Sequence, residues 1–495
     1  MQRYAVSAKL ALFLYSRGMR HLSMVTLLTG VFAVASGAAR AQTTAIALPA
    51  RPNIIFILAD DLGYGDTGPY GQRLIRTPSI DALAASGRVF TQMYAGTSVC
   101  APSRCSLMTG LHTGHAYIRG NKEVKPEGQE PLPGSAVTLA AVLKKAGYTT
   151  GAFGKWGLGP VGSTGDPLRQ GFDVFYGYNS QLESHRYYPT HLWDNDRRVP
   201  LEGVYAPDLI QKRLLSFIDR QAGGGDHAGG RPFFLYAAYT LPHAELVVPD
   251  DSIFESYVGR FPEKPYKGDD STVGGYSSQP YPHATYAAMV TRLDRYVGQI
   301  MVKLREKGLD SNTLVIFTSD NGPHVEGGND PAFFNSAGGL RGVKRDLYEG
   351  GIREPFIARW PGQIPAASRS TFIGAFWDMQ PTFAALAGAP GLPGPDGLSI
   401  VPALTGSGTQ PEHPWLYWEF HEDGGHQAVR QGRWKAVRLH VDKGPGGPVE
   451  LYDLEKDPSE QHNVAAGHPD VARTLAAIMD SAHIPSSLFP FGYEH

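Results

Sequence analysis

Five short apolar segments, separated by sequence with helical features, constrain the fold more than any other feature of this chain. They span residues 52–59, 149–153, 233–238, 313–318 and 356–360. A continuous apolar run of this length is typical of a strand buried on both faces of a sheet. Helices are predicted between them, at residues 77–84, 138–147 and 285–307. Strands that alternate with helices favour an α/β fold with a large, mostly parallel sheet flanked by helices.

The pattern changes after about residue 410. Short strand-like segments follow at 415–420, 427–430, 434–439 and 449–452, and a helical segment follows at 469–482. Short strands joined by turns are typical of an antiparallel sheet. We therefore predict a large α/β domain over residues 42–410 and a small C-terminal α+β subdomain, an antiparallel sheet plus one helix, over residues 411–495.

Residues 1–41 have the features of a signal peptide. Basic residues precede an apolar stretch at 24–34, and the small-residue pattern Ala39-Arg40-Ala41 follows as a cleavage site. The apolar stretch is too short to span a bilayer comfortably. We expect a mature chain from about Gln42 that is exported, periplasmic or secreted, with no stable membrane insertion. A start at Met19 would give a signal of more ordinary length, so the start codon stays open.

The charge balance excludes some classes of partner. The 495 residues include 45 Lys and Arg against 47 Asp and Glu, for a net charge of −2. Such a balance does not favour nucleic acid or an anionic membrane surface as a partner. The chain has two cysteines, Cys100 and Cys105. No disulfide framework is therefore expected, although exported proteins often have one.

Polar clusters follow several of the predicted strands. Asp60-Asp61, Lys155, His243 and Asp320-Asn321 all stand at or just beyond a strand end. In α/β sheets, ligands bind at the carboxyl ends of the strands, so we expect these side chains to gather in one site. Carboxylate and amide oxygens are hard ligands that suit Ca²⁺ or Mg²⁺. For Asp60-Asp61 taken alone, an ordinary acidic turn is the alternative.

The run that begins at Cys100 carries the most specific motif. Cys100-Ala-Pro-Ser-Arg104 is followed by Met108-Thr-Gly110, and this pattern resembles the signature of the type I sulfatases. Further segments resemble that family in the same order along the chain: Gly154–Gly159, Leu241–Ala244, Leu340–Lys344, Tyr348–Arg353 and Leu451–Asn463. From about Pro52 onward the chain therefore resembles the formylglycine-dependent sulfatases of the alkaline phosphatase superfamily.

The resemblance implies an alkaline-phosphatase-like fold and the hydrolysis of sulfate esters. Cys100 would be converted by a formylglycine-generating enzyme to formylglycine, and one hydroxyl of the aldehyde hydrate would attack sulfur. The second hydroxyl would then allow sulfate to be expelled. One Ca²⁺, with Mg²⁺ as the alternative ion, would be held by residue 100 and by four oxygen donors. These donors are Asp60, Asp61, Asp320 and Asn321.

The resemblance also assigns roles to basic residues. Arg104, Lys155 and Lys344 would surround the anionic sulfate and stabilise the charge that moves during transfer. Arg104 follows Cys100 by about one helical turn if Pro102 opens a helix. His243 would protonate the leaving oxygen, a role that suits a side chain with a pKa near 6.5.

Two positions depart from the family pattern. Gly157 stands where the family segment G-K-W-H-L-G has histidine, and Leu111 stands where an arginine is often found. The missing histidine is the expected base for the final elimination. His112 and His115, which are near in sequence, are the candidates to replace it, and we include His115 among the expected catalytic residues. Ordinary loop histidines are the alternative interpretation.

The substrate is less constrained than the reaction. Residues 181–193 are rich in rings that could stack on sugar or aromatic groups, or could form a packed surface loop. We expect sulfated saccharides or aryl sulfates as substrates. A phosphate or phosphonate ester hydrolase on the same scaffold is the second enzyme hypothesis. If Cys100 is unmodified, a sulfated-ligand binding protein without turnover is the third, and the oligomeric state stays undetermined.

Overall fold

The computed structural model describes residues 51–494, apart from 223–229, 270–274, 392–393 and 445. The predicted signal segment and both candidate start positions lie outside the described residues. Within the described part of the chain, no helix is both long and apolar enough to cross a membrane.

A ten-stranded sheet organises the larger part of the molecule, in the order β10-β2-β9-β8-β1-β7-β3-β4-β5-β6. Its centre is a run of five parallel strands, whose pairs are β8/β1, β1/β7, β7/β3 and β3/β4. These strands are β8 (Thr313–Ser319), β1 (Asn53–Ala59), β7 (Phe233–Ala238), β3 (Thr149–Lys155) and β4 (Val174–Tyr178). Every residue of β1, β7 and β8 is buried. The continuous apolar runs therefore identified β1, β3, β7 and β8 correctly, whereas β4 was not predicted.

The flanks of the sheet are mixed in direction. β9 (Arg353–Arg359) runs antiparallel to both β8 and β2 (Arg88–Tyr94), and β10 (Ser368–Ala375) pairs in parallel with β2. On the other side, β5 (His191–Asp194) and β6 (Arg197–Pro200) continue the sheet as antiparallel strands. These flanking strands are more polar than the centre. Apart from β9, the sequence pattern did not reveal them.

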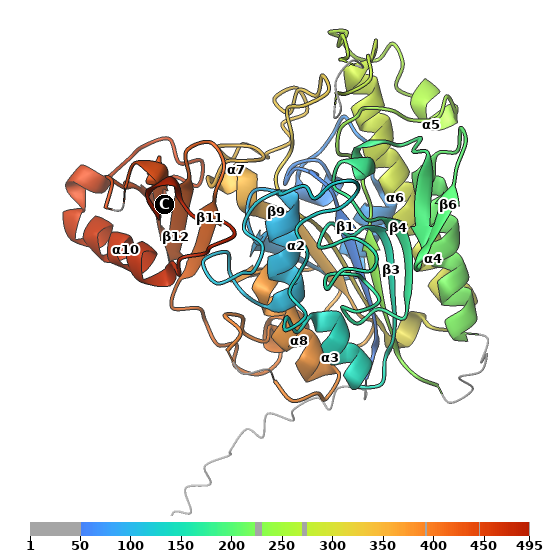
Figure 1. The fold of residues 1–495 in the computed structure, drawn as a ribbon, viewed down its shortest axis with the longest axis horizontal. Coiled ribbons are helices and arrows are strands. Elements are labelled where there is room, and N and C mark those ends of the chain that lie inside the picture. Colours follow the sequence, from blue (N-terminus) through green and yellow to red (C-terminus); the bar gives the residue numbers. More distant parts are fainter. Residues whose placement is uncertain (1–50, 223–229, 270–274, 392–393, 445, 495) are drawn as a thin grey trace, which may run out of the picture. The chain divides into compact units, whose positions relative to one another are not determined.

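Helices cover both faces of the sheet (Figure 1), and the alternation of side chains along β1 decides which core each residue joins. Ile55 and Ile57 pack into a core with α1 (Pro78–Ala85), α4 (Ala206–Ala222) and α6 (Pro282–Glu306). Ile54 and Phe56 point to the opposite face. There they pack into a core with α2 (Cys100–Thr109), α3 (Leu139–Lys145) and α8 (Met379–Leu386). This arrangement confirms the α/β class.

The short helices occupy connecting segments. They are α5 (Ser252–Glu255), α7 (Glu349–Ile352) and α9 (Val401–Thr405). α7 leads directly into β9, so the predicted Tyr348–Arg353 motif forms the approach to that strand.

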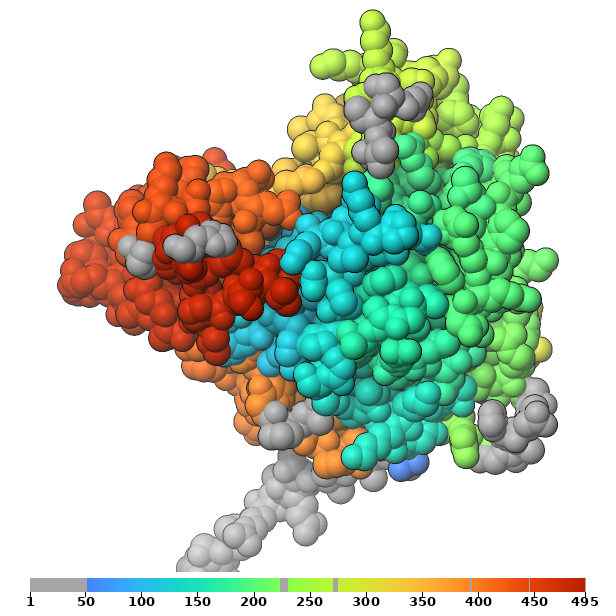
Figure 2. All heavy atoms as spheres, in the orientation of Figure 1, coloured from blue at the N-terminus to red at the C-terminus, as the bar shows by residue number. Residues whose placement is uncertain are grey.

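A second, four-stranded antiparallel sheet follows, as predicted. Its strands are β11 (Leu416–Phe420), β12 (His426–Gln431), β13 (Trp434–Leu439) and β14 (Glu450–Asp453). One face packs against α10 (Pro469–Ala482) through Leu475 and Met479. Figure 2 shows the red C-terminal segment against the blue segment near residue 100. Here the Thr97 hydroxyl donates a hydrogen bond of 2.6 Å to the Glu419 carbonyl oxygen.

Candidate active site

The predicted polar clusters meet at the carboxyl edge of the central strands. Asp60 and Asp61 directly follow β1, Lys155 ends β3, and Asp320 directly follows β8. The parallel register aligns these ends, since Ala59 of β1 pairs with Ser319 of β8. The Asp60 N–H also donates to the Leu241 carbonyl oxygen at 3.1 Å, which brings the loop after β7 to the same edge.

Three fully buried carboxylates and one amide form the acidic part of the site. The Asp61 N–H donates to Asp320 Oδ1 at 3.1 Å, and Asn321 Nδ2 donates to Asp61 Oδ1 at 2.6 Å. Asn321 Oδ1 is buried and accepts no hydrogen bond from the described residues. Asp61 has a positive φ of 61°, a conformation that aspartate adopts more readily than most residues.

Each carboxylate has a cationic side chain close to it, and Asp60 has a second one in Arg104, whose Nη2 lies 3.5 Å from Asp60 Oδ1. Lys155 Nζ lies 2.8 Å from Asp60 Oδ2, and Lys344 Nζ lies 2.8 Å from Asp61 Oδ2. Arg104 Nη2 lies 2.6 Å from Asp320 Oδ2. Burial opposes ionisation, but Lys155 and the neighbouring cations hold the pKa of Asp60 well below its usual range. Burial and the nearby Asp60 raise the pKa of Asp320 to about 7.

Arg104 binds protein groups with most of its guanidinium. Besides Asp320, it donates from Nη1 to the Lys155 carbonyl oxygen at 2.9 Å, so it links the ends of β3 and β8. Ser103, its neighbour in the motif, donates to the Asp320 carbonyl oxygen at 2.6 Å. The Ser-Arg pair of the motif therefore anchors α2 to the end of β8.

Cys100 is the first residue of α2, so the helix begins two residues earlier than an opening at Pro102 would require. Its Sγ lies 3.4 Å from Asp60 Oδ1 and 4.0 Å from Asp61 Oδ1. Burial raises the pKa of the Cys100 thiol well above its usual value, although Lys155 opposes this. An unmodified thiol here is therefore held in its neutral form, which is a poor nucleophile.

His243 and Lys344 lie together beside Asp61. Lys344 Nζ is 2.9 Å from His243 Nε2, and the same Nε2 is 3.3 Å from Asp61 Oδ2. His243 Nδ1 makes a short hydrogen bond to the Ala244 carbonyl oxygen. Since a carbonyl only accepts, Nδ1 carries a proton and Nε2 faces the site. Burial and then Lys344 lower the pKa of His243 well below its usual value.

The structure does not bring His115 to this cluster. His115 Nδ1 lies 2.9 Å from Asp396 Oδ1, and its ring packs on His112 with centroids 4.1 Å apart. Both histidines follow the carboxyl end of α2, whereas Cys100 begins it. A helix of 10 residues separates its ends by about 15 Å. Closeness in sequence to Cys100 therefore does not place His112 or His115 at the acidic cluster. We do not propose either histidine as the base.

Two residues near the cluster were not recognised from the sequence as site residues. The His185 ring stacks on His243, with centroids 4.2 Å apart and planes at 19°. Its signal was the ring-rich segment 181–193, which was interpreted either as a substrate-stacking segment or as a packed surface loop. Glu326 lies 3.4 Å from Lys344 Nζ and 2.5 Å from Arg345 Nη1. No sequence motif singled out Glu326.

The donor set fits a hard divalent cation. Three carboxylates lie together, the Asn321 amide contacts Asp61 through Nδ2, and Asn321 Oδ1 is a buried acceptor that such an ion would satisfy. Ligand atoms of Asp60, Asp61, Cys100 and His243 all lie within 4.8 Å of one another. The geometry thus matches a site that combines a cation, a residue at position 100 and a histidine.

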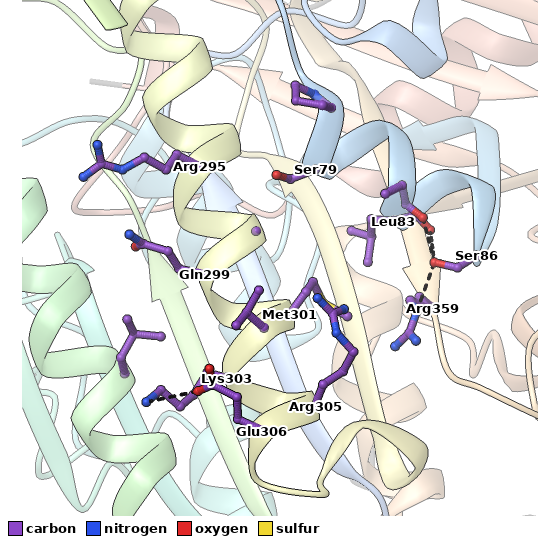
Figure 3. A pocket seen from close by; sticks show the side chains of 15 residues that line it. Ser79, Leu83, Ser86, Arg295, Gln299, Met301, Lys303, Arg305, Glu306 and Arg359 are labelled. Carbon is purple, nitrogen blue, oxygen red and sulfur yellow. Dashed lines mark hydrogen bonds and ion pairs between the residues drawn. The ribbon is translucent and has the colours of Figure 1, made fainter. Parts of the chain in front are cut away.

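A separate groove lies away from this cluster. It has a volume of about 850 Å³ and is lined by α1 and α6, with Leu83 and Met301 among its apolar residues (Figure 3). None of the residues of the acidic cluster lines it.

Comparison with known proteins identifies the family. A model described as "Sulfatase" matches residues 52–389, and one described as "N-sulphoglucosamine sulphohydrolase, C-terminal" matches residues 342–482. The chain belongs to the sulfatase family and is a sulfatase enzyme.

Curated relatives and solved structures agree with this family. Human arylsulfatase A is 35% identical over 468 residues, covering 88% of each chain. Rat N-acetylgalactosamine-6-sulfatase is 31% identical, covering 83% of this chain and 81% of its own. A crystal structure of Ps i-CgsB in complex with k-i-k-neocarrahexaose is 29% identical with a TM-score of 0.72, covering 87% of this chain and 92% of that chain.

Proposed function

We propose that this sulfatase hydrolyses sulfate esters with a formylglycine made from Cys100 and a divalent cation, Ca²⁺ with Mg²⁺ as the alternative. The observation that carries the proposal is the position of residue 100. Its Sγ is buried at the start of α2, 3.4 Å from Asp60 Oδ1, within a cluster of three carboxylates and three cationic side chains. The proposed cation donors are Asp60, Asp61, Asp320, Asn321 and residue 100.

The modified residue and the cation divide the chemistry between them. A hydrated aldehyde at residue 100 supplies a hydroxyl nucleophile that is regenerated after turnover, and the cation supplies positive charge beside the sulfate. Arg104 holds Asp320 and the end of β3 in place through the contacts described above. Lys155 and Lys344 carry the mobile ammonium groups that can turn from the carboxylates toward the substrate sulfate.

His243 is proposed as the general acid. Its Nδ1 proton is held by the Ala244 carbonyl oxygen, so Nε2 is the atom that exchanges a proton with the leaving oxygen. An incoming sulfate anion favours the charged imidazolium. The proton can therefore be taken up as the substrate binds and delivered from Nε2 as the ester bond breaks. Lys344, 2.9 Å away, orients that ring by its contact with Nε2.

Sulfated saccharides are the proposed substrate class, with aryl sulfates as the second. The relatives named for a sulfated amino sugar and for bound neocarrahexaose support the first class, and arylsulfatase A supports the second. His185 and Tyr276, with ring centroids 6.0 Å apart, add an aromatic wall beside His243 that suits a sugar ring.

The proposed maturation follows from the same assignment. A formylglycine-generating enzyme would modify Cys100, and residues 1–41 would direct export to the periplasm or the medium. We retain residues 42–410 as the proposed catalytic domain and 411–495 as the proposed C-terminal subdomain.

The first experiment is mass spectrometry of the peptide that contains residue 100, combined with a sulfate-release assay. Conversion of cysteine to formylglycine lowers the mass by about 18 Da. We expect the modified peptide together with sulfate release from a sulfated sugar. An unmodified thiol in protein from the native host would contradict the proposal. Paired assays on sulfate and phosphonate esters test the second enzyme hypothesis, which predicts faster turnover of the phosphonate.

A further inference from the structure

Gly157 occupies a backbone position in which any residue with a Cβ would be strained. Its φ is +72°, which L-residues other than glycine adopt with strain. A Cβ built at this position would lie 2.3 Å from Gln181 Nε2 and 3.0 Å from its Cδ. The Gln181 side chain therefore fills the volume where a side chain of residue 157 would begin.

The sheet brings these two residues together. β3 and β4 lie side by side in parallel (Figure 1), and Lys155 at the end of β3 pairs with Tyr178 at the end of β4. The Trp156 N–H continues the contact with a 3.1 Å hydrogen bond to the Tyr178 carbonyl oxygen. Gly157 and Gln181 stand two and three residues beyond these ends. Gln181 therefore lies at the same sheet edge as Lys155, the proposed sulfate-binding lysine.

The Gln181 amide has no partner in the described part of the chain. The residue is 7% exposed, and both Nε2 and Oε1 are buried without a hydrogen bond. A buried amide left without partners is unfavourable, because it loses its hydrogen bonds to water. Unpaired polar groups of this kind are uncommon in folded proteins and call for a ligand or another specific explanation.

We propose that the Gln181 amide binds the sulfate group of the substrate, with Nε2–H as the donor, at the position from which the histidine is missing. This inference rests on the proposed function of the site. Sulfate oxygens only accept hydrogen bonds, so the Nε2–H₂ group is a suitable donor for them. An amide in place of the missing histidine has a chemical consequence. An amide does not titrate, so Gln181 orients and holds the anion at any working pH but accepts no proton.

The main test is Gln181→Met, which keeps most of the volume and removes both polar atoms. We expect kcat/KM for a sulfate ester to fall at least about tenfold, the value of one lost hydrogen bond to a charged group. We expect the affinity for inorganic sulfate, measured by calorimetry, to fall by a similar factor. The melting temperature without sulfate should stay the same or rise, because an unpaired buried amide is removed.

Gln299→Met is the matched control. Gln299 Oε1 is also buried without a partner, but this residue lies on α6 at the groove of Figure 3. Its replacement should change neither kcat/KM nor sulfate affinity. If Gln181→Met keeps full sulfate affinity, or only lowers the melting temperature, Gln181 has a packing role and the proposal is wrong.

A second pair of variants tests the shared volume. Gly157→His should lower the melting temperature and kcat/KM, because its Cβ would overlap the Gln181 amide. Gly157→His combined with Gln181→Gly should recover part of both losses, and the recovered activity should show one additional titrating group in its pH profile. Strictly additive effects of the two changes would show that the residues do not compete for space.

The sulfate-binding readout separates this inference from the proposed function. If wild-type protein with formylglycine at residue 100 releases no sulfate from esters, the proposed function fails. Binding of inorganic sulfate by wild type and by Gln181→Met still decides the role of Gln181 in that case. A wild-type protein that binds no sulfate would overturn the assignment of Gln181 as well.

Discussion

The molecule buries two kinds of charged cluster, and they differ in how completely their polar atoms are paired. At the junction with the small sheet, the fully buried Glu349 accepts from Tyr94 Oη at 2.7 Å, from Lys435 Nζ at 3.0 Å and from Arg353 Nη1 at 3.2 Å. Burial opposes ionisation there, but Lys435 and Arg353 lower the pKa of Glu349 to about 2. At the carboxyl edge of the large sheet, the pKa of Asp60 is likewise lowered, and burial raises the pKa of Asp320 to about 7. Burial also raises the pKa of Glu460, beside Lys435, to about 7, so the pKa values do not distinguish the two clusters.

This difference in pairing distinguishes a cluster that stabilises the fold from one that would bind a ligand. Glu349 is surrounded by donors from β2, β9 and β13, so the protein itself supplies what the buried charge needs. In the candidate site, carboxylates face one another while Asn321 Oδ1 and the Gln181 amide have no partner among the described residues. A cation and an anionic substrate would supply the missing charge and hydrogen bonds. Two unpaired amides beside the carboxylates, rather than burial of charge, therefore distinguish the candidate site from the Glu349 cluster.

The largest effect should follow from removing the proposed nucleophile. Cys100→Ala should lower kcat by at least about 10⁴-fold, the scale seen when catalytic nucleophiles are removed. Cys105→Ala is the matched control, since Cys105 lies in the same helix, is fully buried and contacts none of the acidic cluster. It should retain kcat and lose some stability. Assays of sulfate release and thermal unfolding distinguish the two variants. An active Cys100→Ala enzyme would show that residue 100 does not supply the nucleophile.

Calcium should stabilise the protein through the candidate site, and the cluster around Glu349 should not bind it. Removal of a metal-site group typically lowers metal affinity or activity by about 10- to 100-fold. Asn321→Leu should therefore weaken calcium binding by at least this factor and reduce the calcium-dependent rise in melting temperature. Chelation should lower the melting temperature of wild type. Asn312→Leu is the control, because Asn312 Oδ1 is also unpaired but lies just before the amino end of β8. Equal calcium responses in both variants would contradict the proposed metal site.

A change in the cluster around Glu349 should lower the stability of the protein and leave its activity unchanged. Lys435→Met leaves Glu349 and Glu460 buried without their shared cation, whose Nζ lies 3.0 Å from each. Breaking a buried ion pair on one side costs about 3–5 kcal/mol in the free energy of unfolding. Denaturant titration should show this loss, with kcat per folded molecule unchanged. Lys344→Met is the contrasting variant, for which we expect a larger fall in kcat than in stability.

The smallest expected effect concerns pH. Burial raises the pKa of the Glu419 carboxyl, but hydrogen bonds from His421 and His483 outweigh it and lower the pKa to about 2, against an ordinary 4.5. Because the folded-state pKa is depressed, this stabilisation is present above pH 4.5 and is lost as the pH falls toward 2. The lowering corresponds to about 3 kcal/mol at most.

Glu419→Gln should therefore flatten the fall of unfolding free energy between pH 4.5 and 2. Glu455→Gln is the control, since Glu455 is largely exposed and should leave that fall unchanged. An acid limb that is identical in wild type and Glu419→Gln would show that Glu419 is not held in its ionised form by its neighbours.

Much of the fold was predictable from local pattern. The strands of the centre are continuous apolar runs because both their faces are buried, and so β1, β3, β7 and β8 could be located from the sequence. The edge strands β6 and β10 are polar and partly exposed, and their places depend on pairing with β5 and β2. No local pattern carries that information. The small antiparallel sheet was predictable because its short strands are punctuated by turns.

The sequence by itself determined which chemistry-bearing groups meet at the sheet edge. Asp60, Lys155 and Asp320 end parallel strands, and a parallel sheet places all such ends on one side. Only the tertiary structure decided the placement of loop residues, since that depends on packing between segments distant in the chain. In the structure, His115 lies beyond the far end of α2, His185 stacks on His243, and the Gln181 side chain fills the space beside Gly157.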